Sequence, residues 1–566
     1  MSEAKDSTKT DASPYVADDR LQDRGGTPRK LLIFTTLFYF VVFMAFGFSS
    51  FIDDVFASGQ DVIVMVFIFG SLAIFVLWAG WFLLLSGWNW ASRIIATVAL
   101  LAVPYLLGKV FRPVNDGDAN IARFEPIWMR RPEVTAENVE PATNAVDLLT
   151  ETVDDFPQFL GPTQNGVARS GIMIDDEDFS SSKVLWKQPI GKAWSGFSAR
   201  NGFAVTMEQR ESLECVTCYR IDTGQLQWLY SHPARHQDAM NLGRLGPRAT
   251  PTIHNGMVYS MGAVGNLVCL NGEDGNVVWQ VDLNEILGLT LSEIESDGYT
   301  IQHEAESSLA WGRSGAPLMY QNLVIVPGGG TTDGPKSTLL AFDKVSGELQ
   351  WKGGSEMIAY GSPVIATVAD VEQILLTAET KVMSFDPTTG DELWDWPRPG
   401  ASDGSANTSQ VTIVNDTDVV SSKGYPDGGG ERIHIDVNGG KLVPSRVWRN
   451  DRALKTKLMS PVVLEGNAYS LSNGFLECLD LESGKRVWKQ RGRFGHGQLL
   501  LVGRRLLVHS ESGVLYLVRA TPDGYEELGT VSTVEGVCWN TICLYGNQLL
   551  VRSELEAACV EIPLSH

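Results

Sequence analysis

The chain has 566 residues, of which 44% are hydrophobic, so it is long enough to bury a large core. Its formal net charge is -22 at pH 7, which argues against a nucleic-acid partner because such a partner needs a basic protein face. The acidic excess is instead typical of a solvated surface.

The N-terminal part predicts a tail and a membrane anchor. Residues 1–30 are polar and lack apolar periodicity, which predicts a disordered tail. Three apolar stretches follow, at Leu31–Phe51, Val62–Leu85 and Ile94–Val110. The first two are long enough to cross a bilayer as helices, and the third is shorter and contains Pro104. We therefore expect three transmembrane helices within residues 31–111.

The distribution of basic residues predicts which side the tail occupies. Arg20, Arg24, Arg29 and Lys30 precede the first apolar stretch, whereas residues 52–61 contain no Lys or Arg and three Asp. The positive-inside rule then places the tail in the cytoplasm, and three spans place the rest of the chain on the opposite side. Residues 112–155 contain Pro, are acidic and lack a pattern, which predicts a linker.

A short motif recurs five times in the remaining residues, 156–566. Each copy has a small residue, a Gly six residues later and a Trp four residues after the Gly. The copies are Gly224 with Trp228, Gly275 with Trp279, Gly347 with Trp351, Gly390 with Trp394, and Gly484 with Trp488. Gly permits the positive φ of a tight turn, and the Trp is expected on a fourth strand that packs against the next unit. A repeat of roughly 40 to 50 residues made of short strands indicates a propeller or a solenoid.

The last good copy shows what one unit contains. Four β-rich runs are separated by turns, at Ser460–Leu464, Ala468–Leu471, Phe475–Leu479 and Arg486–Trp488. Tight turns join neighbouring antiparallel strands, so the unit is a four-stranded propeller blade.

The number of blades follows from counting complete and degraded copies. One degraded copy ends at Trp448, and another, Leu515–Leu528, has no Trp. The last three strands, at residues 541–562, lack a fourth partner, which Val184–Lys187 can supply and so close the ring without an open edge. We predict an all-β propeller of eight blades, with seven as the alternative.

The Gly-x-x-x-Trp frames stand beside four strand openings that contain Pro, namely Thr250-Pro251, Ala316-Pro317, Ser362-Pro363 and Ser460-Pro461. Over residues 156–566 the chain resembles the PQQ-like β-propeller repeat proteins, a family that includes quinoprotein dehydrogenases and BamB-type outer-membrane assembly factors and that shares the WD40/YVTN-like repeat architecture. The lead-in segment Phe156–Pro162 resembles that of membrane-associated bacterial members, especially planctomycete ones. With the predicted spans, the resemblance implies a multi-pass protein of the inner (cytoplasmic) membrane with a periplasmic propeller.

Few residues suggest chemistry. Cys215 and Cys218 lack the second pair that zinc sites usually need, and a strand turns residues three apart to opposite faces, so packing is favoured over metal or redox use. Cys538 and Cys543 are candidates for a bridge in an oxidising compartment. Acids recur four residues before the repeat Gly, which is typical of a turn and not of an active site: Asp343, Asp386 and Asp480.

The longest departure from the repeat is an insertion at Val281–Trp311, within which Leu287–Ile294 is expected to form a short helix. Long insertions in a propeller lie on a face, where ligands bind.

Two functional hypotheses remain. For a quinoprotein dehydrogenase, the resemblance implies PQQ and calcium in the central channel with an Asp as base. The chain lacks the adjacent cysteine pair common in such enzymes, and no calcium-binding Glu, Asn and Asp set is assigned. The favoured alternative is a non-enzymatic binding or scaffold module for protein assembly at the cell envelope, with no cofactor or metal and with the membrane and other proteins as partners. Its expected recognition residues lie at blade entrances, unless they only cap strands: Arg248, Trp311, Arg313 and Tyr360.

Overall fold

The computed structural model describes residues 28–47, 59–115, 121–126, 128, 134–135, 146–169, 171–238, 243–296 and 298–565. Residues 1–27 of the predicted tail and about half of the predicted linker lie outside the described residues. The chain forms two compact units, a helical unit (residues 1–114 and 120–130) and a β unit (residues 115–119 and 131–566).

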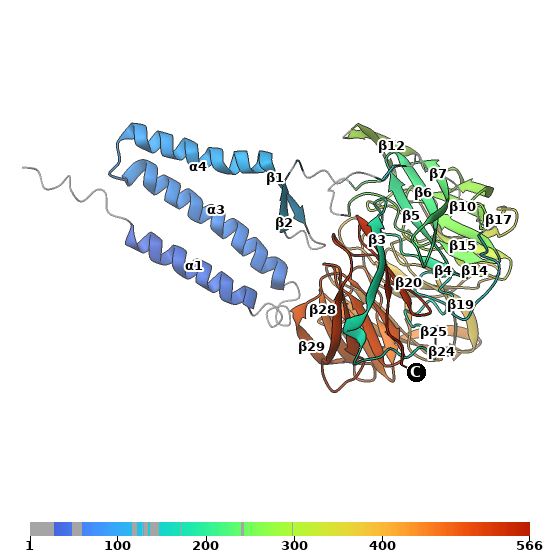
Figure 1. The fold of residues 1–566 in the computed structure, drawn as a ribbon. Coiled ribbons are helices and arrows are strands. Elements are labelled where there is room, and N and C mark those ends of the chain that lie inside the picture. Colours follow the sequence, from blue (N-terminus) through green and yellow to red (C-terminus); the bar gives the residue numbers. More distant parts are fainter. Residues whose placement is uncertain are drawn as a thin grey trace, which may run out of the picture. The chain divides into compact units, whose positions relative to one another are not determined.

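The helical unit contains the three predicted helices, α1 (Arg29–Gly47), α3 (Gly59–Leu85) and α4 (Trp90–Val110) (Figure 1). Helix α3 packs against both α1 and α4, and Trp78 Nε1 donates to Thr35 Oγ1 at 3.0 Å. After α4, strand β1 (Phe111–Asn115) pairs with β2 (Ile121–Pro126).

One helical stretch among the described residues, Val66–Leu85 in α3, is long and apolar enough to cross a membrane by length and composition. Helices α1 and α4, as far as they are described, do not meet the same test. The described helices therefore support one span, and the multi-pass arrangement is not supported by them and stays a prediction.

The β unit is a ring of eight four-stranded antiparallel sheets, which confirms the predicted blade count. The first four blades follow one another along the chain. Blade 1 is β4 (Ser198–Arg200), β5 (Phe203–Arg210), β6 (Leu213–Arg220) and β7 (Leu226–Pro233). Blade 2 is β8 (Thr252–His254), β9 (Met257–Met261), β10 (Asn266–Asn271) and β11 (Val277–Asp282). Blade 3 is β14 (Leu318–Tyr320), β15 (Leu323–Gly330), β16 (Lys336–Asp343) and β17 (Leu349–Gly353). Blade 4 is β18 (Val364–Val368), β19 (Val371–Thr377), β20 (Lys381–Phe385) and β21 (Glu392–Pro397).

The remaining blades include the two degraded copies. Blade 5 is β22 (Thr412–Ile413), β23 (Asp418–Lys423), β24 (Gly429–Asn438) and β25 (Lys441–Asn450). Blade 6 is β26 (Val462–Leu464), β27 (Asn467–Ser472), β28 (Phe475–Asp480) and β29 (Lys485–Arg493). Blade 7 is β30 (Gln498–Val502), β31 (Arg505–His509), β32 (Val514–Arg519) and β33 (Glu527–Ser532). Blade 8 is β34 (Cys543–Tyr545), β35 (Gln548–Arg552), β36 (Glu556–Glu561) and the N-terminal β3 (Lys183–Pro189).

Blade 8 closes the ring as the sequence predicts. Strand β3 pairs antiparallel with β36, with Trp186 opposite Cys559, so strands from both ends of the propeller share one sheet. Figure 1 shows the green β3 among the red C-terminal strands. This closure leaves no blade with a missing strand.

The repeated Gly and Trp lock neighbouring blades together. At all five repeat glycines φ is positive, and a Cβ there would collide with the Trp ring of the preceding blade. The pairs are Gly224 with Trp186, Gly275 with Trp228, Gly347 with Trp279, Gly390 with Trp351, and Gly484 with Trp448. The predicted packing of Trp on the next blade is thus observed, and the Gly is required by the neighbouring ring as well as by the turn.

The register between the third and fourth strands also explains why each copy of the repeat contains a small residue. On the third strand it lies directly opposite the Trp, as Cys218 does with Trp228 and Cys478 with Trp488, so the pair holds one large and one small side chain. In blade 7 Gly529 takes the position of the Trp, and a Cβ there would lie 3.0 Å from Phe179 Cδ1. Phe179, in the 3-10 helix η2 (Phe179–Ser181), is fully buried and fills the place of the missing Trp.

The insertion differs from its prediction. The helix is α5 (Leu283–Leu287), and Leu291–Ser296 forms strand β12, which pairs with β13 (Tyr299–Glu304). The helix begins where Asp282 Oδ1 accepts from Asn284 N and ends at Gly288, whose φ of 68° is left-handed. The expected helix at Leu287–Ile294 is therefore wrong, because it spans this helix stop and the following strand.

Candidate functional site

A cavity of about 350 Å³ lies where the eight blades meet. The first strand of each blade faces the centre of the ring, because β4 contacts β8 and β34, β14 contacts β8 and β18, and β26 contacts β30. The cavity is lined mostly by residues from the segments that enter these inner strands, and every blade contributes at least one residue. Its volume lies within the range of small-molecule sites.

One equivalent position in each blade builds most of the wall. In blade 4 the inner-strand residue Val364 pairs with Leu375, which pairs with the small residue Ser384. We call the residue four before this inner-strand residue the mouth position, and in seven of the eight blades it lines the cavity. In chain order these residues are Trp194, Arg248, Ser314, Tyr360, Thr408, Leu458 and Trp539. In blade 7 the wall instead contains Gln498.

Aromatic rings form much of the wall. Trp194 and Trp539, from blades 1 and 8, lie with their ring centroids 4.4 Å apart. Trp311 is held in place because its Nε1 donates to the Asp403 carbonyl oxygen at 3.2 Å and its backbone N–H donates to Tyr360 Oη at 3.1 Å. The Tyr360 hydroxyl in turn donates to the Ser402 carbonyl oxygen at 2.5 Å. These hydrogen bonds fix the rings before any ligand arrives.

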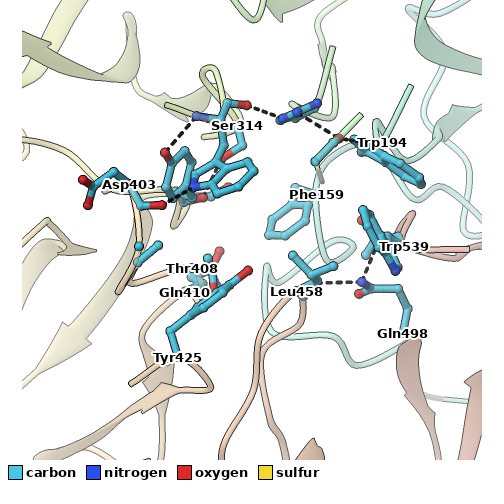
Figure 2. A pocket seen from close by; sticks show the side chains of 18 residues that line it. Phe159, Trp194, Ser314, Asp403, Thr408, Gln410, Tyr425, Leu458, Gln498 and Trp539 are labelled. Atoms are coloured by element: carbon cyan, nitrogen blue, oxygen red, sulfur yellow. Dashed lines mark hydrogen bonds between the residues drawn. The ribbon is translucent and has the colours of Figure 1, made fainter. Parts of the chain in front are cut away.

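The lead-in segment and the residues that follow it as far as Val167 run across the inner strands, and Phe159 lines the cavity. Phe156 pairs with Ala199 of β4, Val167 pairs with Leu501 of β30, and the Gln164 carbonyl accepts from Gln410 Nε2 at 2.6 Å. Figure 2 shows Phe159 in the middle of the cavity wall, with Trp194 and Trp539 on one side and Tyr425 and Asp403 on the other. This segment therefore forms part of the cavity as well as a tie between blades.

The cation on the wall, Arg248, is occupied by backbone carbonyls. Its Nη1 donates to Gly246 O at 2.9 Å, its Nη2 donates to Gly243 O at 3.0 Å and to Arg244 O at 3.3 Å, and its Nε donates to Trp311 O. Burial lowers the pKa of Arg248 to about 10, against the opposing field of Asp238, Tyr360 and Glu214. Four of the five guanidinium N–H groups thus serve the scaffold.

Two buried glutamines, Gln410 of blade 5 and Gln498 of blade 7, add polar groups to the wall. Gln498 Nε2 donates to Leu458 O at 2.6 Å and to Trp539 O at 2.8 Å. Gln410 Nε2 donates to Gln164 O, and no donor among the described residues reaches its Oε1. Because a carbonyl oxygen can only accept, these bonds assign the amide nitrogens and leave both side-chain oxygens as acceptors.

The structure brings three of the four predicted recognition residues to this cavity: Arg248, Trp311 and Tyr360. The fourth, Arg313, is 2% exposed and does not line it. Its Nε donates to Glu304 Oε1 at 2.6 Å and its Nη1 donates to Pro327 O and Gly328 O, so it joins the insertion to blade 3. The recognition role of the other three stays a prediction.

Sequence reasoning missed most of the wall, including Trp194, Trp539, Tyr425, Phe159 and Gln498. A signal was present in the four blades that open with Pro. In each of these blades the mouth position lies three residues before the Pro: Arg248, Ser314, Tyr360 and Leu458.

The other candidate groups have structural roles. Cys215 and Cys218 lie on β6, both fully buried, and all seven cysteines are free thiols. Asp343 and Asp386 each accept hydrogen bonds from the backbone N–H groups of the residues two and three positions later, as the turn interpretation predicts. The backbone donor of Ser346 is the main cause of the lowered pKa of Asp343. Within the described part of the chain, no group of three or more His, Cys, Asp or Glu is placed to hold a metal ion.

The wall does not fit PQQ with calcium. Calcium takes six to eight oxygen ligands, commonly carboxylates, and PQQ is a flat anion that requires cationic donors. Among the described cavity residues Asp403 is the one carboxylate, and it is exposed. Arg248 is the one cation among the same residues, and its N–H groups are largely committed.

Comparison with known sequences agrees with the repeat. The family model described as outer membrane protein assembly factor BamB matches residues 212–490. The BamB of Kangiella koreensis is 28% identical over 154 residues, which are 27% of this chain and 35% of that protein. The chain thus matches about a third of the length of this curated relative.

Comparison with solved structures shows the same fold. A europium-containing methanol dehydrogenase matches with a TM-score of 0.50 and 10% identity over 70% of this chain and 90% of the other. The quinohemoprotein alcohol dehydrogenase of Comamonas testosteroni matches with a TM-score of 0.50 and 13% identity over 72% and 80% of the two chains. The BamB of Moraxella catarrhalis, at a TM-score of 0.44 and 14% identity, is covered over 99% of its length by 67% of this chain. At these identities the likeness concerns the fold alone.

Proposed function

Because the chain is a PQQ-like β-propeller protein, we propose that it is a membrane-anchored binding or scaffold module for protein assembly at the cell envelope. The observation that carries this proposal is the mouth position. The mouth position is equivalent in each blade of the repeated scaffold, but its side chain differs from blade to blade and is aromatic, basic, hydroxyl-bearing or aliphatic. These side chains converge on one cavity. Such a wall suits recognition, since its described residues offer shape and fixed hydrogen bonds and include no convergent set of acid, base and nucleophile.

We infer that the partner is a protein. The matched family model and the matched relative are both described as an outer membrane protein assembly factor, which supports this inference. To test this, a photo-crosslinking residue is placed at Gly404 on the cavity wall, where an added Cβ would meet no atom within 4 Å. Gly492 on β29 is the matched control, because a Cβ there also meets nothing and the residue lies outside the cavity. We expect an envelope protein to crosslink at residue 404 of the full chain in cells and not at residue 492. Equal crosslinking at both positions would contradict the proposal.

The dehydrogenase alternative is tested by calorimetric titration of PQQ with Ca²⁺ into the detergent-solubilised full chain. We expect no saturable binding. The described wall offers Ca²⁺ one exposed carboxylate, and the guanidinium that could bind PQQ already donates to backbone carbonyl oxygens. One-to-one binding would instead favour a quinoprotein and justify assays with alcohols and sugars.

We place the propeller on the periplasmic side of the inner membrane. An odd number of spans, whether the one supported by α3 or the three predicted, puts the propeller opposite the basic N-terminal tail. Protease added to intact spheroplasts is expected to cut the linker at residues 112–155. Cleavage only after lysis would place the propeller in the cytoplasm.

A further inference from the structure

The cavity is better suited to an uncharged ligand than to an ion. Four N–H groups of Arg248 are bonded to backbone carbonyls, so this side chain offers an anion little direct hydrogen bonding. Its positive charge on the wall also opposes a bound cation, and the one carboxylate among the described cavity residues, Asp403, is exposed, so water screens its attraction for a cation. The desolvation of any ionic ligand in an aromatic cavity would therefore remain largely uncompensated.

The wall nevertheless keeps a buried side-chain acceptor. Gln498 is 3% exposed, and both N–H groups of its amide are used by Leu458 O and Trp539 O. Among the described residues no donor reaches its Oε1, which therefore remains an open acceptor of a residue on the cavity wall. Gln410 Oε1 also lacks a donor within the described chain, but its neighbours shield it from the cavity, so Gln498 is the one able to contact a ligand directly.

This acceptor lies beside aromatic surface. Gln498 is bonded to the backbone of Trp539, and Leu458, its other partner, packs with Trp194 and Trp539 in one apolar cluster. Trp311, Tyr360 and Phe159 supply further rings around the same cavity. Aromatic faces favour a ring-shaped ligand through stacked or edge-to-face contacts.

We propose that this cavity binds an uncharged aromatic molecule bearing an N–H or O–H group, with its ring against the tryptophans and its donor bonded to Gln498 Oε1. The inference concerns the cavity that carries the proposed function and rests on that function only if the ring belongs to a protein partner, because binding of a free small molecule is measured without any partner. The same chemistry is offered by a free small molecule and by a Trp side chain on a peptide.

The probes are indole, which has a ring and one N–H donor, 1-methylindole, which lacks the donor, and the anion indole-3-acetate. Each is titrated by calorimetry into the detergent-solubilised full chain, with detergent alone as the blank. We expect saturable binding of indole with a Kd at or below about 1 mM. Loss of one hydrogen bond should weaken 1-methylindole by about three- to tenfold, and the buried charge should weaken indole-3-acetate further.

Two variants locate the site. Gly404→Trp should fill the cavity and abolish indole binding, because an added Cβ meets no atom and φ is not left-handed. Gly492→Trp, matched in both respects but outside the cavity, should bind indole like the original chain. A blocked Gly-Trp-Gly peptide that binds more tightly than indole identifies a peptide as the source of the ring, and weaker binding identifies a free molecule.

Three results would overturn the inference. The first is the absence of saturable indole binding. The second is equal affinity for indole and 1-methylindole, because the N–H group would then form no hydrogen bond with Gln498. This comparison needs no mutation. The third is full indole binding by a folded Gly404→Trp variant.

Discussion

The contact between the repeat Gly and the Trp of the preceding blade should be a main source of stability, and blade 6 allows a controlled test. At Gly484 φ is 67° and a Cβ would lie 2.5 Å from Trp448 Cδ2. At Gly466, in the same blade, φ is 79° and a Cβ would meet no atom within 4 Å. Replacing Gly466 with Ala therefore introduces backbone strain alone, whereas replacing Gly484 adds a clash with a ring.

The expected costs follow from these two geometries. A left-handed Ala costs about 1–2 kcal/mol, so Gly466→Ala should lower the free energy of unfolding by that amount. Overpacking adds about 1–3 kcal/mol, so Gly484→Ala should cost about 2–5 kcal/mol. The assay is guanidinium unfolding of the detergent-solubilised full chain followed by circular dichroism, in which the midpoint shift gives the difference.

A double-mutant cycle assigns the extra cost to the ring. In a Trp448→Ala background the clash is gone, and Gly484→Ala should cost no more than Gly466→Ala. Equal costs for the two glycines in the original chain, or an undiminished cost of Gly484→Ala without Trp448, would refute the proposed role of the contact.

Three further measurements test titratable groups. Burial raises the pKa of Glu214 from 4.5 to about 7, so its contribution to stability is complete below pH 4.5 and is lost as the pH rises through 7. Glu214→Gln should remove this loss of stability, which is worth up to about 3 kcal/mol, and so raise the midpoint of guanidinium unfolding at pH 8. An unchanged unfolding midpoint at pH 8 would contradict the reasoning. A hydrogen bond to Asp418 raises the pKa of His434, so its contribution is complete below pH 6.5 and falls as the pH rises through the higher native pKa; His434→Gln should flatten that decline in the same unfolding assay. Burial raises the thiol pKa to about 12 at Cys215, so a thiol reagent at pH 8 should label none of the seven buried cysteines in the native chain and all seven in denaturant; rapid native labelling would disprove their burial.

The propeller was predictable because its signals are local and repeated. Each Gly and Trp frame spans only a few residues, and the four runs of Ser460–Trp488 correspond to β26, β27, β28 and β29. Ring closure was also predictable, since a three-stranded C-terminal blade left Val184–Lys187 as its missing strand. The insertion was mispredicted because the short apolar run at Leu287–Ile294 fits either a helix or a strand, and Gly288 decides between them.

The cavity could not be predicted in the same way, because its residues occur once each and are brought together only when the ring closes. Trp194 and Trp539 lie near opposite ends of the propeller sequence, and neither belongs to a repeat frame. Arg248, Trp311 and Arg313 are predicted because they stand in polar clusters at blade entrances, although the Arg313 side chain turns away to Glu304. Spacing from the Pro discriminates between these cases, since Arg313 lies four residues before Pro317 and Ser314, at the mouth position, lies three before it.

The Gly and Trp of the repeat frame and the residues at the mouth positions lie in different parts of each blade. This separation explains how a regular scaffold can hold an irregular site. The Trp and Gly contacts lie between outer strands and the turns of the next blade, whereas the mouth positions precede the inner strands. A change of side chain at Ser314 or Thr408 therefore alters the cavity without touching the contacts that join blades. The blades that depart most from the frame, blades 5 and 7, supply the two amide side chains of the cavity lining, Gln410 and Gln498. Recognition can thus diversify at the inner ends of the blades while stability is maintained between their outer strands.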